Sequence, residues 1–244
     1  MKEDKEIREF YSRQDESNKY DSVRFRNGGL VVDESEKKLV MNLAKTEKMQ
    51  NILDVATGTG RFARLFSKDK KNKVFGFDYS KKMIKILKEN KENYFEKVRG
   101  DAKMLPFKNN SFDCVTSMRF MIHYDDLSVF LKEMSRVSKK HIIFDTPNKY
   151  SLKTIVSFAT NVTKKIFGFS YMSWFSEKDM RKTFDSLNLK VIGVRKTFFL
   201  PQGIYRFLPY PLARAAKRID DFILHEILKG RMACAHTWML AVKR

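Results

Sequence analysis

The sequence predicts an α/β fold that opens with a strand, a glycine loop and a helix over residues 51–66. Residues 52–55 form an apolar run around one carboxylate, which is typical of a buried strand. Two glycines, Gly58 and Gly60, occupy the turn that follows, where the backbone must bend sharply and a ligand can lie against main chain. Apolar residues then recur at helical spacing: Phe62, Ala63, Leu65 and Phe66. The N-terminus of that helix would offer unpaired N–H groups to a nucleotide-type ligand.

Two classes of ligand are compatible with this loop. Gly58, Gly60 and Ala63 fit the dinucleotide spacing G-x-G-x-x-G/A, and Asp78 lies about where a ribose-binding acid belongs. Asp54, however, places a carboxylate at the end of the loop's own strand, where it would repel a phosphate. That carboxylate favours a ligand that carries an ammonium group.

Length and composition predict one domain with elaborations and a cationic surface. The 244 residues have room for a sizeable core, and the formal net charge of +20 favours association with something anionic. The two cysteines have neither a disulfide framework nor a zinc spacing, which favours a reducing, cytoplasmic setting. The first ten residues lack the apolar region of a signal peptide, and no stretch approaches the roughly 18 apolar residues of a membrane span.

Four motifs carry a resemblance to a known family. DVATGTG at residues 54–60 resembles motif I of class I S-adenosylmethionine (SAM)-dependent methyltransferases. VFGFDYS at residues 74–80, GDAKMLPF at residues 100–107 and SFDCVTS at residues 111–117 follow in the family's order. The resemblance points to the group that acts in ubiquinone and menaquinone biosynthesis. It implies SAM as cofactor and a Rossmann-like seven-stranded sheet in the order 3-2-1-4-5-7-6, with the last strand antiparallel.

The region ahead of motif I is expected to hold helices and a loop. Residues 3–11 are expected to form a short helix, residues 20–29 a loop, and residues 35–45 a second helix. The resemblance implies that residues 1–50 form an arm over the cofactor, with Tyr20 and Arg24 as lid contacts. A surface tyrosine and a solvated arginine are the alternative.

The second strand is expected at residues 73–78 and ends in Asp78, whose two carboxylate oxygens can accept both ribose hydroxyls. Ser80 is expected to cap a helix that runs to about residue 90. Tyr79 and Met83 either belong to the core or pack on the adenine faces. A third strand is expected around residues 95–99, and the resemblance implies that the adenine edge is recognised just beyond it.

The fourth strand, residues 111–117, should bring the reacting groups together. Because ligands lie beyond the carboxyl ends of parallel strands, the edge that follows should face the transferable methyl group. The resemblance implies these cofactor-binding residues: Asp54, Ala56, Thr57, Gly58, Thr59, Gly60, Asp78, Tyr79, Met83, Asp101, Ala102, Met104, Ser117, Met118 and Arg119. His123 is a candidate general base or substrate contact, although packing against the next helix is the commoner role. Tyr124 is a candidate substrate contact.

Two positions depart from the family pattern. RVSKKH at residues 136–141, between a predicted helix at 127–137 and a strand at 141–145, stands where a Pro-Gly-Gly turn is usual. Ala56 replaces the first glycine of motif I, as in quinone C-methyltransferase-like members, and it is expected to need only a negative φ.

The family signal thins beyond residue 145. Residues 146–175 and 201–232 are predicted to cap the substrate, around a capping-box helix that starts at Ser176 and a strand at residues 190–200. The last strand is expected at residues 236–242. A helix in the second cap carries an apolar face made of Leu212, Ala215, Ala216, Ile219, Phe222, Ile223 and Ile227. That face is expected to pack on the sheet edge, or alternatively to cover an apolar substrate or lie on a membrane surface.

These observations predict a methyltransferase that acts on a small-molecule or lipid-like acceptor such as a quinone. Methyl transfer from a sulfonium is an in-line displacement, so alignment alone can supply up to about 7–11 kcal/mol. No metal site is expected. An RNA or protein acceptor is the alternative that the positive charge suggests, and a non-catalytic SAM-binding regulator is a third. Peripheral binding at an anionic membrane surface is an expected location.

Overall fold

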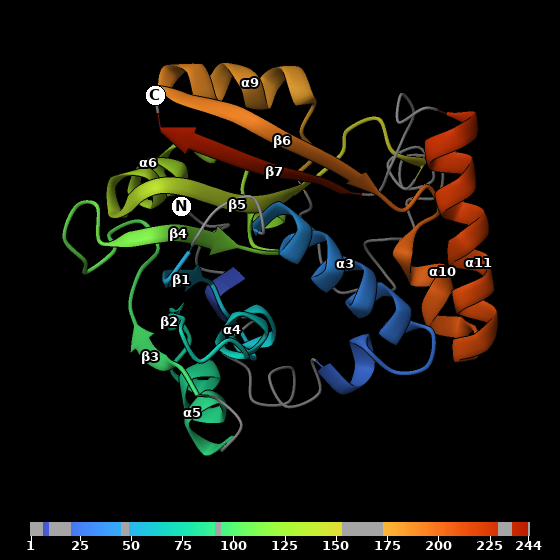
Figure 1. The fold of residues 1–244 in the computed structure, drawn as a ribbon, viewed down its shortest axis with the longest axis horizontal. Helices are drawn as coiled ribbons and strands as arrows, with labels where there is room; N and C mark the ends of the chain where they lie inside the picture. The colour runs from blue at the N-terminus through green and yellow to red at the C-terminus, as the bar shows by residue number, and fades with distance from the viewer. Residues whose placement is uncertain are drawn as a thin grey trace.

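The computed structural model describes residues 7–9, 21–44, 49–90, 94–152, 173–228 and 236–243. In this part of the chain, one seven-stranded sheet has the order β3-β2-β1-β4-β5-β7-β6 (Figure 1). Its strands are β1 Asn51–Val55, β2 Lys73–Asp78, β3 Glu96–Arg99, β4 Phe112–Ser117, β5 Ser138–Pro147, β6 Leu189–Thr197 and β7 His236–Lys243. The pairs from β3 to β5 are parallel, and β7 pairs antiparallel with both β5 and β6. The predicted fold class and strand order are confirmed.

Helices cover both faces of the sheet and enclose two cores. Helices α3 Gly29–Ala44, α4 Arg61–Ser67 and α5 Lys81–Glu89 bury Val40, Phe62 and Leu87 against one face. On the other face, α6 Ser128–Val137 and α9 Glu177–Ser186 bury Leu131 and Phe184. Apolar residues on one side of each of these helices explain the two cores, because each helix lies on the sheet by that side.

Two helix starts follow directly from local sequence. The Ser80 hydroxyl accepts a hydrogen bond from the backbone N–H of Met83 at 3.3 Å, and α5 begins at Lys81, directly after Ser80. Ser176 accepts the N–H of Asp179 at 3.1 Å and donates its own hydroxyl to the Asp179 carboxylate at 2.6 Å. Each cap satisfies a donor that the first turn leaves unpaired, so both predicted starts are confirmed.

The N-terminal region differs from its prediction. Residues 7–9 are helical, while the rest of the helix predicted at 3–11 lies outside the described residues. Residues 21–24, predicted as loop, are helical, and α3 starts at Gly29, well before the predicted residue 35. Val31 and Val32 in the added turn pack against Tyr205 and other residues far along the chain. The extension depends on these long-range contacts, which the local pattern does not contain.

RVSKKH, at residues 136–141, stands where the family usually has a Pro-Gly-Gly turn, and the structure forms no separate turn there. Helix α6 ends at Val137 and β5 begins at Ser138, whose N–H is bonded to the Met134 carbonyl. The Ser138 hydroxyl donates to the carbonyl of His141 at 2.9 Å. The chain thus passes from helix to strand without a loop, and β5 is longer at both ends than the predicted residues 141–145.

A helix pair at one end of the molecule follows β6 (Figure 1). It consists of α10 Gln202–Phe207 and α11 Tyr210–Phe222, which continues as a π-helical turn over Ile223–Ile227. Both helices contact α3, and α11 buries Ala213, Lys217 and Asp220. Its predicted apolar face points the other way, so the expectation that this face packs on the sheet edge is wrong. Among the described helices, none combines the length and the apolar character needed to cross a bilayer.

Candidate active site

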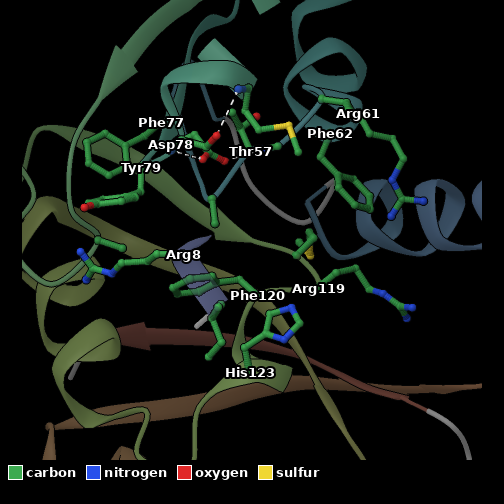
Figure 2. A pocket seen from close by; sticks show the side chains of 18 of the residues that line it. Arg8, Thr57, Arg61, Phe62, Phe77, Asp78, Tyr79, Arg119, Phe120 and His123 are labelled. Carbon is green, nitrogen blue, oxygen red and sulfur yellow. Dashed lines mark hydrogen bonds between the residues drawn. The ribbon is translucent and has the colours of Figure 1, made fainter. Parts of the chain in front are cut away.

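A pocket lies at the carboxyl ends of β1, β2 and β4, where a parallel sheet of this type holds its ligands. It is open to solvent, and about 970 Å³ of space, open solvent included, lies within its bounds. Figure 2 shows Asp78 and Tyr79 on one side of the pocket, with Arg119, Phe120 and His123 on the other. The lining residues are Ile7, Arg8, Ala56, Thr57, Gly58, Thr59, Arg61, Phe62, Phe77, Asp78, Tyr79, Ser80, Met83, Ala102, Met118, Arg119, Phe120, His123 and Tyr124.

Asp78 fixes the loop and the strand end to each other. One of its carboxylate oxygens accepts the Gly58 N–H at 2.8 Å, and the other accepts the Ser80 N–H at 2.9 Å. Burial raises the pKa of Asp78, and these two hydrogen bonds act against that rise. Each oxygen keeps a further acceptor position, because a carboxylate oxygen has two lone pairs.

The glycine loop contains three residues with left-handed backbone: Ala56 at φ 55°, Gly58 at φ 56° and Gly60 at φ 80°. The expectation that Ala56 needs only a negative φ is therefore wrong. The turn imposes the conformation of the family's glycine on an alanine, at a cost of roughly 1–2 kcal/mol.

The two glycines have different surroundings. A Cβ on Gly58 would meet nothing within 4 Å, in a pocket that this residue lines. A Cβ on Gly60 would lie 2.7 Å from Leu87 and 2.8 Å from Phe95, both in the core. Gly58 thus leaves open space at the pocket wall, whereas Gly60 permits close packing behind the loop.

Asp54 does not line the pocket. It is 2% exposed, and its carboxylate accepts the hydroxyls of Thr57 at 2.7 Å and Thr116 at 2.8 Å. Burial raises the pKa of Asp54 to about 6, although both hydroxyls favour the charged form. The side chain therefore fastens the loop to β4.

Arg8 lies at the Tyr79 side of the pocket. Its guanidinium is 4.3 Å from the centre of the Tyr79 ring and bonds the Asp101 carboxylate at 2.8 Å. Asp101 and Met104 are not among the lining residues, and Met104 is 78% exposed. Ala102 and Met83 do line the pocket.

The opposite side is aromatic and cationic. Phe120, Tyr124 and Phe130 form a ring cluster with centroid separations of 4.5–5.1 Å. Arg119 has φ 62°, and its backbone N–H donates to Asp145 at 2.6 Å. Ser117, two residues before Arg119, is fully buried and does not line the pocket.

His123 ends a short 3-10 helix, Met121–His123, that follows β4. Burial, together with the positive charges of Arg24 and Arg119, lowers the pKa of His123 to about 3, with Asp145 acting in the opposite sense. The imidazole is therefore neutral at physiological pH. A neutral ring can accept a hydrogen bond, but this pKa makes it a weak general base.

A buried polar network connects this side to distant parts of the chain. Glu36 bonds Arg61 at 2.6 Å and Arg119 at 3.3 Å. Gln202 of α10 donates to Glu36 at 3.0 Å and accepts from Arg119 at 2.8 Å. Sequence reasoning missed Arg8 and Arg61 in the pocket lining and Glu36 and Gln202 behind it. Arg61 directly follows the second glycine of motif I, which is the one local signal.

The predicted lid residues have different outcomes. Tyr20 lies outside the described residues, as does most of residues 146–175. Arg24 is close enough to His123 to affect its pKa, but it does not line the pocket. In the described part of residues 201–232, no residue lines the pocket, and Gln202 bonds a lining residue, Arg119.

An acid at the end of β2, a glycine loop after β1 and an aromatic side after β4 define an α/β protein with a nucleoside-type cofactor site. Comparison with known proteins finds a family match for the part of the chain that carries most of this site. Residues 53–144, which include the glycine loop and Asp78, match the family described as methyltransferase domain. The resemblance that the four motifs predict is confirmed.

Relatives and solved structures agree with this result. The chain is 31% identical over 150 residues to a demethylmenaquinone methyltransferase from Bacteroides fragilis. That match covers 57% of this chain and 61% of the relative, so the chain spans about three fifths of the relative's length.

Two solved structures share the fold. A SAM-dependent methyltransferase from Thermotoga maritima has a TM-score of 0.65 at 20% identity, covering 96% of this chain and 98% of its own. Magnesium protoporphyrin IX methyltransferase from Synechocystis, solved with bound SAH, has a TM-score of 0.64 at 15% identity, covering 99% and 100%. At these identities the likeness shows the class I methyltransferase fold.

Proposed function

We propose that the protein is a SAM-dependent methyltransferase whose acceptor is a quinone-like or other lipid-like aromatic molecule. The observation that carries the proposal is one pocket with Asp78 and the glycine loop on one side and Phe120 and Tyr124 on the other. The name of the Bacteroides relative supports a quinone-type acceptor.

The pocket residues fit SAM. The open space beside Gly58 accepts a ligand against main chain, and Asp78 retains acceptor positions for two ribose hydroxyls. Tyr79, Met83 and Ala102 would contact the adenine. Asp54 lies behind the loop, where its partial negative charge favours the cationic methionine part without contact.

When bound, SAM supplies a methyl group on a positively charged sulfur. The chain's own groups would act on the acceptor: Phe120 and Tyr124 would stack on its ring and exclude water, and neutral His123 would accept a hydrogen bond from its hydroxyl. The positive charges of Arg24 and Arg119, which lower the pKa of His123, would also favour loss of the acceptor's proton. The acceptor held by these residues would take the methyl group in place of the sulfur and would release its own proton to solvent.

Uptake of labelled methyl groups tests the proposal. Purified protein is incubated with methyl-labelled SAM and with separate lipid and quinone, RNA, protein and small-molecule pools, including a reduced demethylmenaquinone. Label in the quinone fraction is the expected result. Label in RNA or protein alone would overturn the acceptor assignment. SAM binding by calorimetry with no labelled pool would favour the non-catalytic regulator.

RNA is the second candidate acceptor, and the net charge of +20 favours it. Against it, the sequence after β4 is SMRF, without the Asn-Pro-Pro-Tyr-type motif of amino-methylating enzymes. We also propose peripheral location at an anionic membrane surface, and a division into an arm at residues 1–50, a cofactor core at 51–145, and substrate caps at 146–175 and 201–232.

A further inference from the structure

The outward side of α11 is apolar although nothing in the described chain covers it. Leu212, Ile219, Phe222 and Ile227 are each 58–62% exposed. Leu212 and Ile219 are about two turns apart, and Ile219 and Phe222 are about one turn apart, so these three lie on one side of the helix. Ile227 follows more than one turn later. Phe207, at the end of neighbouring α10, is 86% exposed. Several large apolar side chains thus face solvent along one helix pair.

Polar anchors on the opposite side of α11 fix this orientation. Buried Asp220 accepts the backbone N–H groups of Phe199 at 3.1 Å and Leu200 at 2.8 Å. Lys217 is 7% exposed, pairs with Asp221 and lies 4.8 Å from the centre of the Phe198 ring. Rotating the apolar side inward would break these contacts and leave backbone donors unpaired, which costs about 1–3 kcal/mol for each.

The charges near the apolar side of α11 indicate which kind of partner it would bind. Arg214 and Arg218 are exposed and lie next to the apolar residues around the helix, while Glu226 is an exposed acid near its end. The chain as a whole carries +20, which opposes association of two copies and favours an anionic surface. Nucleic acid would use the charges but would leave the apolar side chains in water.

We propose that the outward side of α11, with Phe207, lies in the headgroup region of an anionic bilayer. Apolar burial and the attraction between Arg214, Arg218 and the lipid phosphates would act together, as they do for interfacial helices. The inference rests on the proposed function in one respect: a lipid-like acceptor lies in the membrane on which the helix would rest.

The helix pair is also connected to the acceptor side of the pocket. Gln202, the first residue of α10, bonds both Arg119, which lines the pocket, and Glu36, which bonds Arg61. Val31 and Val32 of α3 share a small core with Tyr205 of α10 and Ala213 of α11. Binding through α11 would therefore hold the acceptor side in a fixed relation to the membrane.

Vesicle flotation tests the inference without requiring methyl transfer. Wild type is mixed with phosphatidylcholine vesicles with and without phosphatidylglycerol, at low and high salt. We expect binding to the anionic vesicles that weakens with salt. The double variant I219S/F222S should bind at least about tenfold more weakly, and R214Q and R218Q about fivefold each. Ile192→Ser, at a residue 49% exposed on β6, is the matched control and should bind as wild type.

SAM affinity by calorimetry shows that each variant is folded, and it reports on the cofactor site independently. Wild type that ignores anionic vesicles, or I219S/F222S that floats as wild type does, would overturn the inference even if the quinone is methylated. Loss of a dimer in I219S/F222S on light scattering would assign the face to a second copy instead. Salt-sensitive retention of RNA without vesicle binding would also overturn it.

Discussion

The glycine-loop region and the α10–α11 pair contrast in how well local pattern predicts burial. From residue 51 to residue 90, most buried positions of β1, α4, β2 and α5 are apolar, with Asp54 and Arg61 as exceptions, and β2 has the predicted bounds. In α11 the large apolar residues Leu212, Ile219 and Phe222 are exposed, while Lys217 and Asp220 are buried with Ala213. Periodicity locates an amphipathic helix in both regions. It does not give the inward face of α11, which combines Ala213, packed in a small apolar core, with Asp220, which accepts two backbone N–H groups.

The largest expected effect comes from removing a buried acid, which should have different consequences in the two regions. Asp78→Ala removes up to two charge-assisted bonds to ribose, and calorimetry should show SAM affinity lowered by up to about 3 kcal/mol for each bond. Asp220→Ala, the counterpart in α11, should lower the free energy of unfolding but leave SAM affinity of the folded protein unchanged. Equal loss of SAM affinity in both variants would contradict the contrast.

Substitutions of the two glycines test the comparison within the loop itself. Gly60→Ala combines left-handed backbone with contacts of 2.7 and 2.8 Å to the core, so the free energy of unfolding should fall by about 2–4 kcal/mol. Gly58→Ala meets no atom and should cost about 1–2 kcal/mol. Urea denaturation measures both, and a larger loss for Gly58→Ala would show that the loop is placed incorrectly.

Asp54 provides a test by pH. Burial raises the pKa of Asp54 from 3.8 to about 6 in the folded protein. The contribution of Asp54 to the free energy of unfolding is therefore fully present below pH 3.8 and is lost as the pH rises through about 6. Asparagine does not titrate. The stability of Asp54→Asn relative to wild type should therefore rise by about 3 kcal/mol between about pH 4 and about pH 7. A pH-independent difference in urea titrations would mean that Asp54 keeps its ordinary pKa.

The smallest effect is expected at Ala56, which is strained, and a strained residue of the other region serves as its contrast. Ala56→Gly should raise the free energy of unfolding by about 0.5–1 kcal/mol, because glycine adopts a φ of 55° without a Cβ penalty. Phe198, at φ 59° ahead of α10, is fully buried and meets the Tyr205 ring edge to face, so Phe198→Gly should destabilise instead. Thermal melts distinguish the signs, and a destabilised Ala56→Gly would show that the loop carries no strain.

Much of the fold was predictable because its determinants are local. The Ser80 and Ser176 caps, the β2 bounds and the four motifs all depend on residues within one element or its turn. They also locate Asp78, Gly58 and His123 at one edge of the sheet.

The remainder of the site depends on contacts between distant residues. Arg8 with Asp101 and Glu36 with Gln202 are separated by 93 and 166 positions, and nothing in the flanking residues specifies these partners. The sign of φ at Ala56 was missed because alanine is compatible with helix and strand, and the turn alone imposes the left-handed form. The direction of α11 was missed because it is set by backbone donors at Phe199 and Leu200.

The position of β7 also determines the order in which the sheet can assemble. Strands β1, β2 and β3 pair with their neighbours in the chain, and β4 pairs with β5, which follows it. The β5–β7 pair instead joins distant residues such as His141 and Val242, and β6 pairs within the sheet only with β7, which lies between it and β5. Bringing β7 beside β5 closes a long loop, so its entropy cost must be met before the new pairing contributes. The half of the sheet that carries the glycine loop can therefore form early. The half that orients α10 and α11 must wait for residues 236–243, and completion of the sheet should be the slow step of folding.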